Sequence, residues 1–246
     1  GLLQQLMADA SLNLGFRATA MHYVSTQPLE IPGHVHAARA DPQSQTAYAR
    51  QAAQDWENIL LARAAELIPG GRFICLNFGI DEQGRYLGNT GGHHMFDHFH
   101  KFWLALYQDG SITSDEYQCA SFAQYYRTMD EFCAPFSDAE SAVSKAGLKL
   151  KSCHSKLTKC PYEKAFLDAG GVGGSMTNLD YANSLIPTMR SWSETVFRTA
   201  LDSRDADEAA QIIDRFYTAY RDAVAANPTG HAMDYVHIIL DIEKVG

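Results

Sequence analysis

Residues 73–78, with the sequence Phe-Ile-Cys-Leu-Asn-Phe, form a continuous apolar run that is biased towards β-branched and aromatic side chains. Such a run is typical of a strand buried on both faces, as in a parallel sheet that is covered by helices. Pro69-Gly70-Gly71 stands just before it and should end a preceding helix. The run therefore predicts a central strand of an α/β sheet.

The residues before this run predict a strand followed by a long helix. Residues 12–16 alternate with a period of two, which is typical of a strand. Asp41-Pro42 suits a helix start, because aspartate is an N-cap acceptor and proline fits the first helical position. Residues 12–78 thus predict a β-α-β unit with a right-handed crossover, and residues 2–9 predict the end of a short helix. Apolar positions then recur at helical spacing: Tyr48, Ala52, Trp56, Ile59, Leu60, Ala64 and Leu67.

The residues after this run predict a helical insertion and the rest of the sheet. Residues 79–92 are a glycine-rich loop, and residues 93–146 are mostly helical without a convincing strand. Strands are expected at 148–159 and 235–242, and helices at about 179–201 and 205–226. The sequence therefore predicts an α/β sheet with a helical cap.

Composition excludes several classes of protein. The 246 residues are 46% hydrophobic and carry a net charge of −9. This negative charge argues against binding to nucleic acid or to an anionic membrane surface. No run of about 18 apolar residues is present, so no membrane span is expected. The five cysteines are odd in number and lack a CxxC spacing, and no signal peptide is visible. Reduced thiols in a cytoplasmic protein are the simplest interpretation.

Two stretches resemble a known enzyme family. They are residues 16–25, FRATAMHYVS, and residues 55–72, in which DWENIL is followed by ELIPGGR. Together they resemble the SABATH family, the salicylate, benzoate and theobromine methyltransferases that use S-adenosylmethionine. The cap, the helix around Met189-Arg190-Ser191-Trp192 and the final strand also fit in order.

The resemblance implies a fold and an activity. The fold is a partial class I, Rossmann-like methyltransferase sheet formed by residues 1–92 and 147–246, with residues 93–146 as the substrate-binding cap. The activity is methyl transfer from S-adenosylmethionine to the carboxylate of a small aromatic or hydrophobic acid. A ring nitrogen is the alternative acceptor, because some relatives methylate one.

The cofactor-binding features of this family are not found in this chain. Relatives carry a glycine-rich turn and an acidic ribose-binding residue on earlier strands. The cluster at 170–174 follows a helical segment, so a mobile linker is expected there. We therefore expect a piece of a longer protein, starting at Gly1, with an incomplete cofactor site and an exposed strand edge at 12–16 that favours a homodimer. The alternative is a non-catalytic fragment that binds a small acid or a partner chain.

Carboxyl methylation requires placement of the reactants, so no catalytic triad or dedicated base is expected. The resemblance puts Tyr23 where relatives have a tryptophan that bonds the substrate carboxylate, with His22 beside it. Ala18 and Thr19 are expected near the cofactor, and Gly1 and Leu2 would overlay a pair that brackets its adenine. Without the family match, His22 and Tyr23 could merely cap a loop, and the helical methionine and aromatic residues could be plain core. The remaining expected substrate-binding residues are Phe78, Met95, Phe96, Met189 and Trp192.

A group of histidines follows the glycine-rich loop. His93, His94, His98 and His100 lie close in sequence, and His94 and His98, four residues apart, share a helix face. A zinc site needs at least a third protein ligand, and Asp97 faces the wrong way for that pair. The sequence therefore predicts a solvated or capping histidine patch and no metal.

Overall fold

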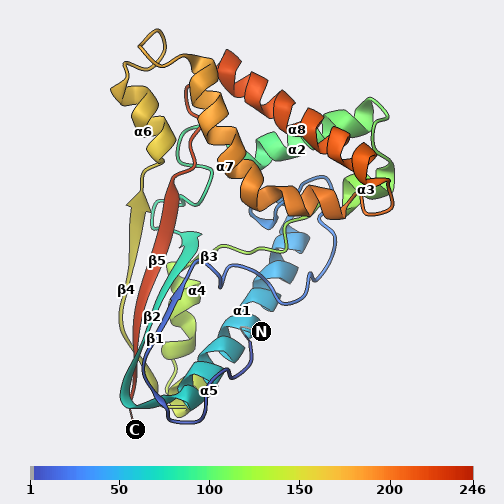
Figure 1. Ribbon diagram of the computed structural model, residues 1–246. Helices are drawn as coiled ribbons and strands as arrows, with labels where there is room; N and C mark the ends of the chain where they lie inside the picture. Colours follow the sequence, from blue (N-terminus) through green and yellow to red (C-terminus); the bar gives the residue numbers. More distant parts are fainter. Residues whose placement is uncertain (1–2, 246) are drawn as a thin grey trace.

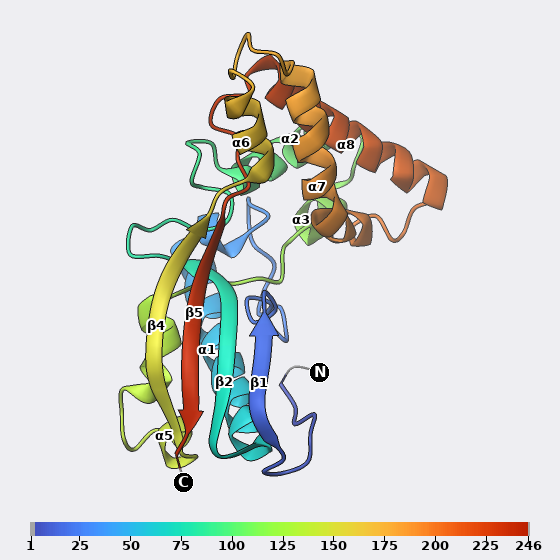
Figure 2. The same cartoon turned by 60° about the vertical axis from the view of Figure 1, so that its left-hand side comes forward.

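The apolar run at residues 73–78 lies in β2 (Leu67–Ile80), the longest strand of the computed structural model, which describes residues 3–245. β2 runs parallel to β1 (Leu12–Ala18) and antiparallel to β5 (Tyr235–Lys244), which pairs with β4 (Leu148–Thr158). The strand order is β1-β2-β5-β4, so β1 and β4 form the two edges. Figure 2 shows this sheet broadside.

The predicted β-α-β unit is confirmed. The long helix α1 (Pro42–Glu66) connects β1 to β2. Its N-cap Asp41 accepts hydrogen bonds from the backbone N–H groups of Gln43 and Ser44 at 2.9 and 3.0 Å. The apolar stripe of α1 packs into the same core cluster as the buried side chains of β2 and β5.

β2 begins six residues earlier than the predicted start at Phe73, because Leu67 already pairs with Leu12. The β1–β2 register shifts between Leu12 and Leu14, so the Pro-Gly-Gly stretch forms an irregularity inside the strand. Gly70 has φ +80°, and a Cβ on Gly71 would lie 2.8 Å from the Ile68 carbonyl oxygen. Glycine therefore reshapes the strand here, where the sequence indicated a helix stop and loop.

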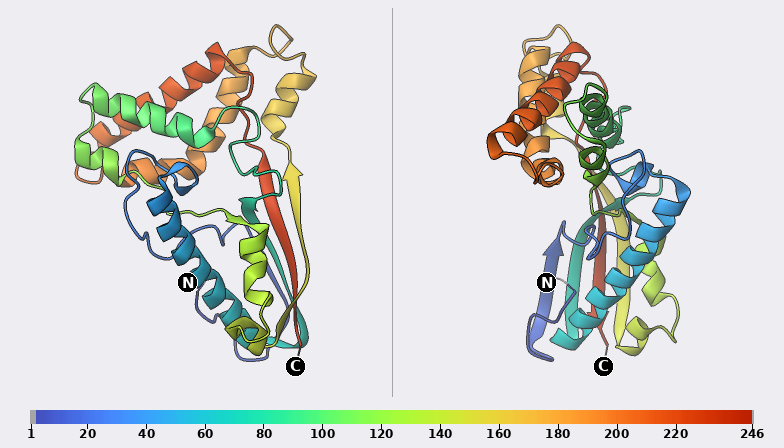
Figure 3. Two further views of the ribbon diagram at one scale, coloured as in Figure 1. Left: turned by 180° about the vertical axis from the view of Figure 1, so that it is seen from behind. Right: turned by 90° about the vertical axis from the view of Figure 1, so that its right-hand side faces the viewer.

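Helices cover only one face of the sheet. α1, α4 (Met129–Cys133) and α5 (Ala142–Lys145) lie on the same side (Figure 3), and the broadside view shows no helix on the other (Figure 2). Buried residues of β2 therefore alternate with half-buried ones such as Ile74 and Leu76. The prediction that this strand is buried on both faces is wrong, because the described residues supply no second helical layer.

A group of helices lies at the carboxyl ends of β1 and β2 (Figure 1). It contains helices of the predicted 93–146 insertion and also later helices, and the whole group is called the cap from here on. Its core consists largely of aromatic side chains, including the fully buried Phe99, Trp103 and Phe197. Two of its helices match the predicted ones near 179–201 and 205–226, whereas α6 was not predicted. The cap helices are α2 (Met95–Gln108), α3 (Ser114–Cys119), α6 (Pro161–Asp168), α7 (Asn178–Thr199) and α8 (Ala206–Ala226).

Short elements complete the chain. β3 (Arg127–Thr128) pairs in parallel with the end of β2, although no strand was predicted between 93 and 146. Two turns of 3-10 helix, η1 (Ala37–Arg39) and η2 (Ala134–Phe136), lie in connecting segments. The residues 170–174 connect α6 to α7. The division into 1–92 plus 147–246 and a 93–146 insertion stays a prediction.

The short helix predicted at 2–9 is wrong for the described residues 3–9, which contain no helix. The backbone N–H of Met7 instead donates to the carboxylate of Glu66 at 3.2 Å. Glu66 is held by a buried ion pair with Arg63 at 2.6 Å. A tertiary contact with the end of α1 thus replaces local helical hydrogen bonding.

Candidate active site

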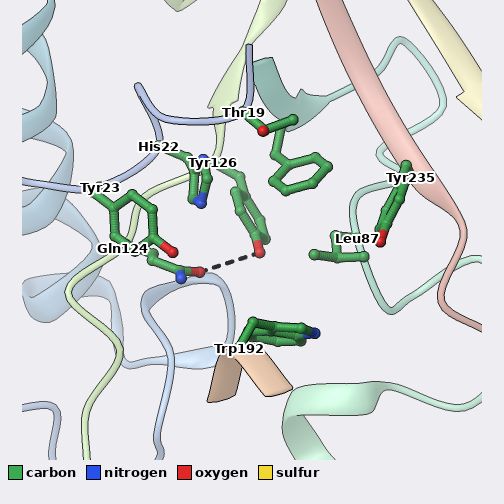
Figure 4. Close-up of a pocket in the computed structure, with 9 residues that line it drawn as sticks. Thr19, His22, Tyr23, Leu87, Gln124, Tyr126, Trp192 and Tyr235 are labelled. Carbon is green, nitrogen blue, oxygen red and sulfur yellow. Dashed lines mark hydrogen bonds between the residues drawn. The ribbon is translucent and has the colours of Figure 1, made fainter. Parts of the chain in front are cut away.

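A cavity of about 180 Å³ lies where β1 and β2 end, beneath the cap (Figure 4). Ligand sites form at such carboxyl ends of parallel strands in α/β sheets. The wall is mainly aromatic, and none of the nine lining residues is lysine or arginine. They are Thr19, His22, Tyr23, Phe78, Leu87, Gln124, Tyr126, Trp192 and Tyr235.

The turn after β1 brings His22 and Tyr23 into the cavity wall. Thr19 has φ +51°, a left-handed conformation that non-glycine residues rarely adopt, and its N–H donates to the Leu76 carbonyl at 2.8 Å. The N–H of Met21 donates to the fully buried Asn77 side chain at 2.9 Å. The ends of β1 and β2 are thus tied together at the point where the cavity begins.

Arg127 supports this turn from behind. Its guanidinium, 2% exposed, donates to the backbone carbonyls of Met21 and Ala52. Burial lowers the pKa of Arg127 to about 10, so it remains charged at neutral pH. The cation therefore fixes the loop without itself lining the cavity.

His22 is a neutral ring in this wall. Burial, together with the positive charge of Arg127, lowers the pKa of His22 to about 3. Its ring centroid lies 4.3 Å from that of Tyr23 and 5.0 Å from that of Phe78. Nδ1 has no hydrogen-bond partner among the described residues. His22 can therefore act as a neutral hydrogen-bonding group but not as a counter-ion.

A second group of lining residues comes from residues 122–126. The N–H of Tyr125 donates to the His22 carbonyl at 2.7 Å, and Tyr23 and Gln124 form an isolated antiparallel bridge. The Tyr126 hydroxyl donates to Gln124 Oε1 at 3.3 Å, as drawn in Figure 4. Burial raises the pKa of Tyr126 far above its usual range, so the phenol stays protonated. The side chains of Gln124 and Tyr23 both line the cavity, so an amide and a second hydroxyl are available there as donors.

Four lining residues were missed by the sequence analysis. Gln124 and Tyr126 lie in a segment predicted to be mostly helical, and no local pattern indicated that it runs beside residues 22–24. Tyr235 begins the predicted last strand. Its position in the cavity wall depends on the antiparallel pairing of β5 with β2, which the sequence did not indicate. Leu87 lies in the glycine-rich loop and carried no sequence signal.

The residues expected from the resemblance fall into three groups. His22, Tyr23, Phe78, Trp192 and Thr19 line the cavity together. Three others are buried in the core of the cap instead, and Phe96 there stacks on His36 with ring centroids 3.9 Å apart. Ala18 is exposed at the end of β1, and Leu2, like Gly1, lies outside the described residues. Their binding roles stay predictions. The three core residues are Met95, Phe96 and Met189.

A second cavity, of about 320 Å³, adjoins Tyr23. Its lining is apolar or weakly polar and contains no carboxylate. Asp55 lies nearby, but its oxygens already accept hydrogen bonds from the N–H and hydroxyl of Ser25, both at 2.7 Å. These residues offer one wall for a bulky organic cofactor but no carboxylate acceptor for ribose hydroxyls. The lining residues are Leu3, Gln4, Ala20, Tyr23, Val24, Ser25 and Ile59.

Comparison with known protein families defines the class. Residues 3–245 match the family described as SAM dependent carboxyl methyltransferase, so the chain belongs to this S-adenosylmethionine-dependent family. This confirms the predicted family and methyl donor. A search of curated protein sequences finds no match.

One solved structure supports the fold. The chain is similar to a structure titled loganic acid methyltransferase with SAH, with a TM-score of 0.72 and 15% identity over 100% of this chain and 65% of that one. This likeness confirms the predicted α/β methyltransferase fold. The chain spans 65% of that protein's length. A geranyl diphosphate C-methyltransferase from Streptomyces coelicolor A3(2) matches with a TM-score of 0.33 and 9% identity, over 100% of this chain and 52% of that one. A TM-score this low supports no conclusion about the fold.

None of the helices within residues 3–245 is both long enough and apolar enough to cross a lipid bilayer.

Proposed function

We propose that the protein containing this chain methylates the carboxylate of a small aromatic or hydrophobic acid, using S-adenosylmethionine. The main support for this proposal is the cavity at the ends of β1 and β2. Its wall is mainly aromatic, and its polar groups are neutral. Its volume of about 180 Å³ suits a small acid better than a drug-sized ligand, since pockets for the latter are typically ~300 Å³ or more.

Neutral donors suit this reaction. Tyr23 and Gln124 present a hydroxyl and an amide that can hold a carboxylate, and Tyr126 orients the amide. A carboxylate paired with arginine would be held more strongly, but its charge would be partly neutralised and its oxygen made less nucleophilic. Donors without charge therefore orient the acid while preserving its reactivity.

The atoms and charges of the reaction balance without a protein base. The carboxylate oxygen forms a bond to the methyl carbon, the carbon–sulfur bond breaks, and its electron pair stays on sulfur. S-Adenosylmethionine supplies a sulfonium centre that makes this methyl group electrophilic. Opposite charges disappear as the ester and thioether form, so a cavity that excludes water favours the transition state. The neutral His22 and aromatic wall are consistent with that requirement.

The cofactor would contact the cavity beside Tyr23. We propose Ala18 and Thr19 as contacts, together with Leu2. The described residues fit only one side of the cofactor, because none of those lining that cavity is a carboxylate that could bind both ribose hydroxyls. The ring of Tyr23 lines both cavities and thereby separates acid from cofactor.

We further propose a homodimer formed through the free edge of β1 and a cytoplasmic location. The edge carries Leu14 and Phe16, which are 60% and 63% exposed. All five cysteines are free thiols, which supports a reducing compartment.

Two measurements on the same preparation test the activity. Methyl transfer to a panel of aromatic and aliphatic acids, with ring-nitrogen acceptors beside them, should give methyl esters only. Calorimetry with S-adenosylhomocysteine should show micromolar binding, about −8 kcal/mol. Binding of an acid with no binding of S-adenosylhomocysteine and no turnover would favour the binding-module alternative. N-methylated products would overturn the assignment of the carboxylate.

A further inference from the structure

Three histidine rings meet outside the cavity. The side chains of His93, His98 and His231 place one ring nitrogen each so that all three lie within 4.8 Å of one another. The ring centroids are 4.5 Å apart for His93 and His231, 4.7 Å for His98 and His231, and 5.2 Å for His93 and His98. His93 precedes α2, His98 is in its first turns, and His231 lies in the segment that leads into β5.

Hydrogen bonds hold this geometry. Nδ1–H of His98 donates to the His94 carbonyl at 3.0 Å, which leaves the lone pair of Nε2 free to bind a ligand. The His98 ring also stacks on buried Tyr220, with centroids 5.4 Å apart and planes inclined by 14°. A carbonyl partner on one ring nitrogen is the usual way in which a metal-binding histidine is oriented.

The backbone beside the other two histidines is equally constrained. The N–H of His93 donates to the Gly230 carbonyl at 3.2 Å, and the Tyr181 hydroxyl donates to the carbonyl of His231. A Cβ on Gly91 would lie 2.4 Å from the Gly230 carbonyl oxygen. The two loops therefore approach as closely as glycine allows, and this approach is what brings His231 to the other rings.

We propose that His93, His98 and His231 form a binding site for a divalent transition-metal ion, with zinc the best fit. Three imidazoles with an open fourth position match a known class of zinc coordination. The group contains no carboxylate, so magnesium and calcium, which require oxygen ligands, do not suit it. The sequence analysis predicted no metal because the pair His94 and His98 lacked a third ligand. The structure instead groups His98 with His93, and His231 joins them from a distant segment.

The site would brace the cap against the sheet. Its ligands join the start of α2 to the segment before β5, and Tyr235 of the cavity lies at the start of that strand. Carboxyl methylation needs no metal, so the ion would act on rigidity and not on the bond-forming step. This proposal is independent of the proposed function, since its test needs no methyl transfer.

The experiment uses tag-free protein stripped by a chelator and titrated with Zn²⁺ and with Co²⁺ against a chromophoric chelator. One ion per chain is expected. Zn²⁺ at 100 times its dissociation constant should raise Tm by about 5–10 °C. His231→Ala and His93→Gln should each weaken binding at least 10-fold and abolish the rise in Tm.

Two control variants keep the test specific. His154→Ala removes an exposed histidine on β4, and Cys119→Ser removes the exposed thiol; neither should change the affinity. His93 is only half-buried, so His93→Gln tests the site even where His231→Ala does not fold. Failure of the unaltered protein to bind one ion, or unchanged binding in His93→Gln, overturns the proposal.

Discussion

Tyr23 is the residue on which the proposed chemistry depends most. Its side chain is 50% exposed and lines both cavities, so it can contact an acid on one side and a cofactor on the other. The resemblance puts Tyr23 where relatives have a tryptophan, and the ring N–H of tryptophan lies at a different distance from the backbone than the hydroxyl of tyrosine. Gln124, which bridges to Tyr23 and also lines the cavity, offers a second neutral donor for the proposed acid.

Replacing Tyr23 by phenylalanine should lower kcat/KM for the acid about 10- to 100-fold. The reason is the loss of one hydrogen bond to a charged group, which contributes about 1.5–3 kcal/mol. Steady-state kinetics with saturating S-adenosylmethionine would measure it, with Tyr107→Phe on the exposed side of α2 as the matched control. An unchanged kcat/KM would mean that Gln124 holds the carboxylate without Tyr23.

The buried histidines His22 and His36 make stability depend on pH. Burial is the main cause that lowers the pKa of each to about 3 from the ordinary value of 6.5. Between these values the unfolded chain binds protons that the folded chain does not. The stabilising contribution is therefore complete above pH 6.5 and is lost as the pH falls towards 3.

Urea unfolding between pH 5 and 7.5 should show this loss. The free energy of unfolding should decrease on acidification with a slope that approaches ~1.4 kcal/mol per pH unit for each of the two histidines. His36→Gln should reduce the slope by one proton, whereas Asn13→Gln, which exchanges two groups that do not titrate on exposed β1, should leave it unchanged. Equal slopes for His36→Gln and the unaltered chain would contradict the neutral state of His36.

At the scale of single elements, the Pro-Gly-Gly stretch of β2 decides how β1 pairs. The register shift lets Leu12 pair with Leu67 and then Leu14 with Arg72, so β2 accommodates three more residues than β1 between these two pairs. That arrangement requires a backbone without a side chain at Gly71. It also sets the register that carries Thr19 to the end of β2.

Gly71→Ala should destabilise the fold by about 1–3 kcal/mol, the usual cost of forcing extra atoms into a packed region. Its Cβ would lie 2.8 Å from the Ile68 carbonyl oxygen and 2.9 Å from that of Leu12. Chemical denaturation measures the change, and Asn13→Ala, on an exposed position of β1, is the control. A loss below 0.5 kcal/mol, which is the range of ordinary surface changes, would show that the bulge can relax.

At the scale of the whole molecule, the two edges of the sheet differ. β4 carries exposed Lys149, Lys151 and Lys156, which discourage pairing with another strand. β1 instead exposes Leu14 and Phe16, and the sheet face without helices lies beside it. The chain also spans only 65% of the similar loganic acid methyltransferase. The exposed apolar side chains of β1 make this edge the one at which we propose the homodimer to form.

The chain by itself should associate through this edge. We expect light scattering coupled to size exclusion to show a dimer or larger species, and the double change Leu14→Lys with Phe16→Lys to give a monomer. Leu167→Lys, at a position 60% exposed on α6, is the control and should leave the association unchanged. A monodisperse monomer of the unaltered chain at high concentration would contradict the proposed homodimer.

Several features follow from the sequence alone, because they depend on near neighbours in the chain. The Asp41-Pro42 helix start, the apolar stripe of α1 and the run at 73–78 predict elements by local hydrogen bonding and periodicity. The family resemblance placed His22 and Tyr23 after a strand, and the structure places both in the cavity wall.

Other features were decided only by tertiary structure, because they join segments far apart in the chain. Gln124 reaches the cavity by bridging to Tyr23, and His231 reaches His93 through two closely packed glycine loops. Residues 3–9 do not form the predicted helix; the backbone N–H of Met7 donates to the carboxylate of Glu66 instead. Local sequence patterns do not encode such contacts. The contacts become favourable only when the fold brings distant segments together and buries them away from water.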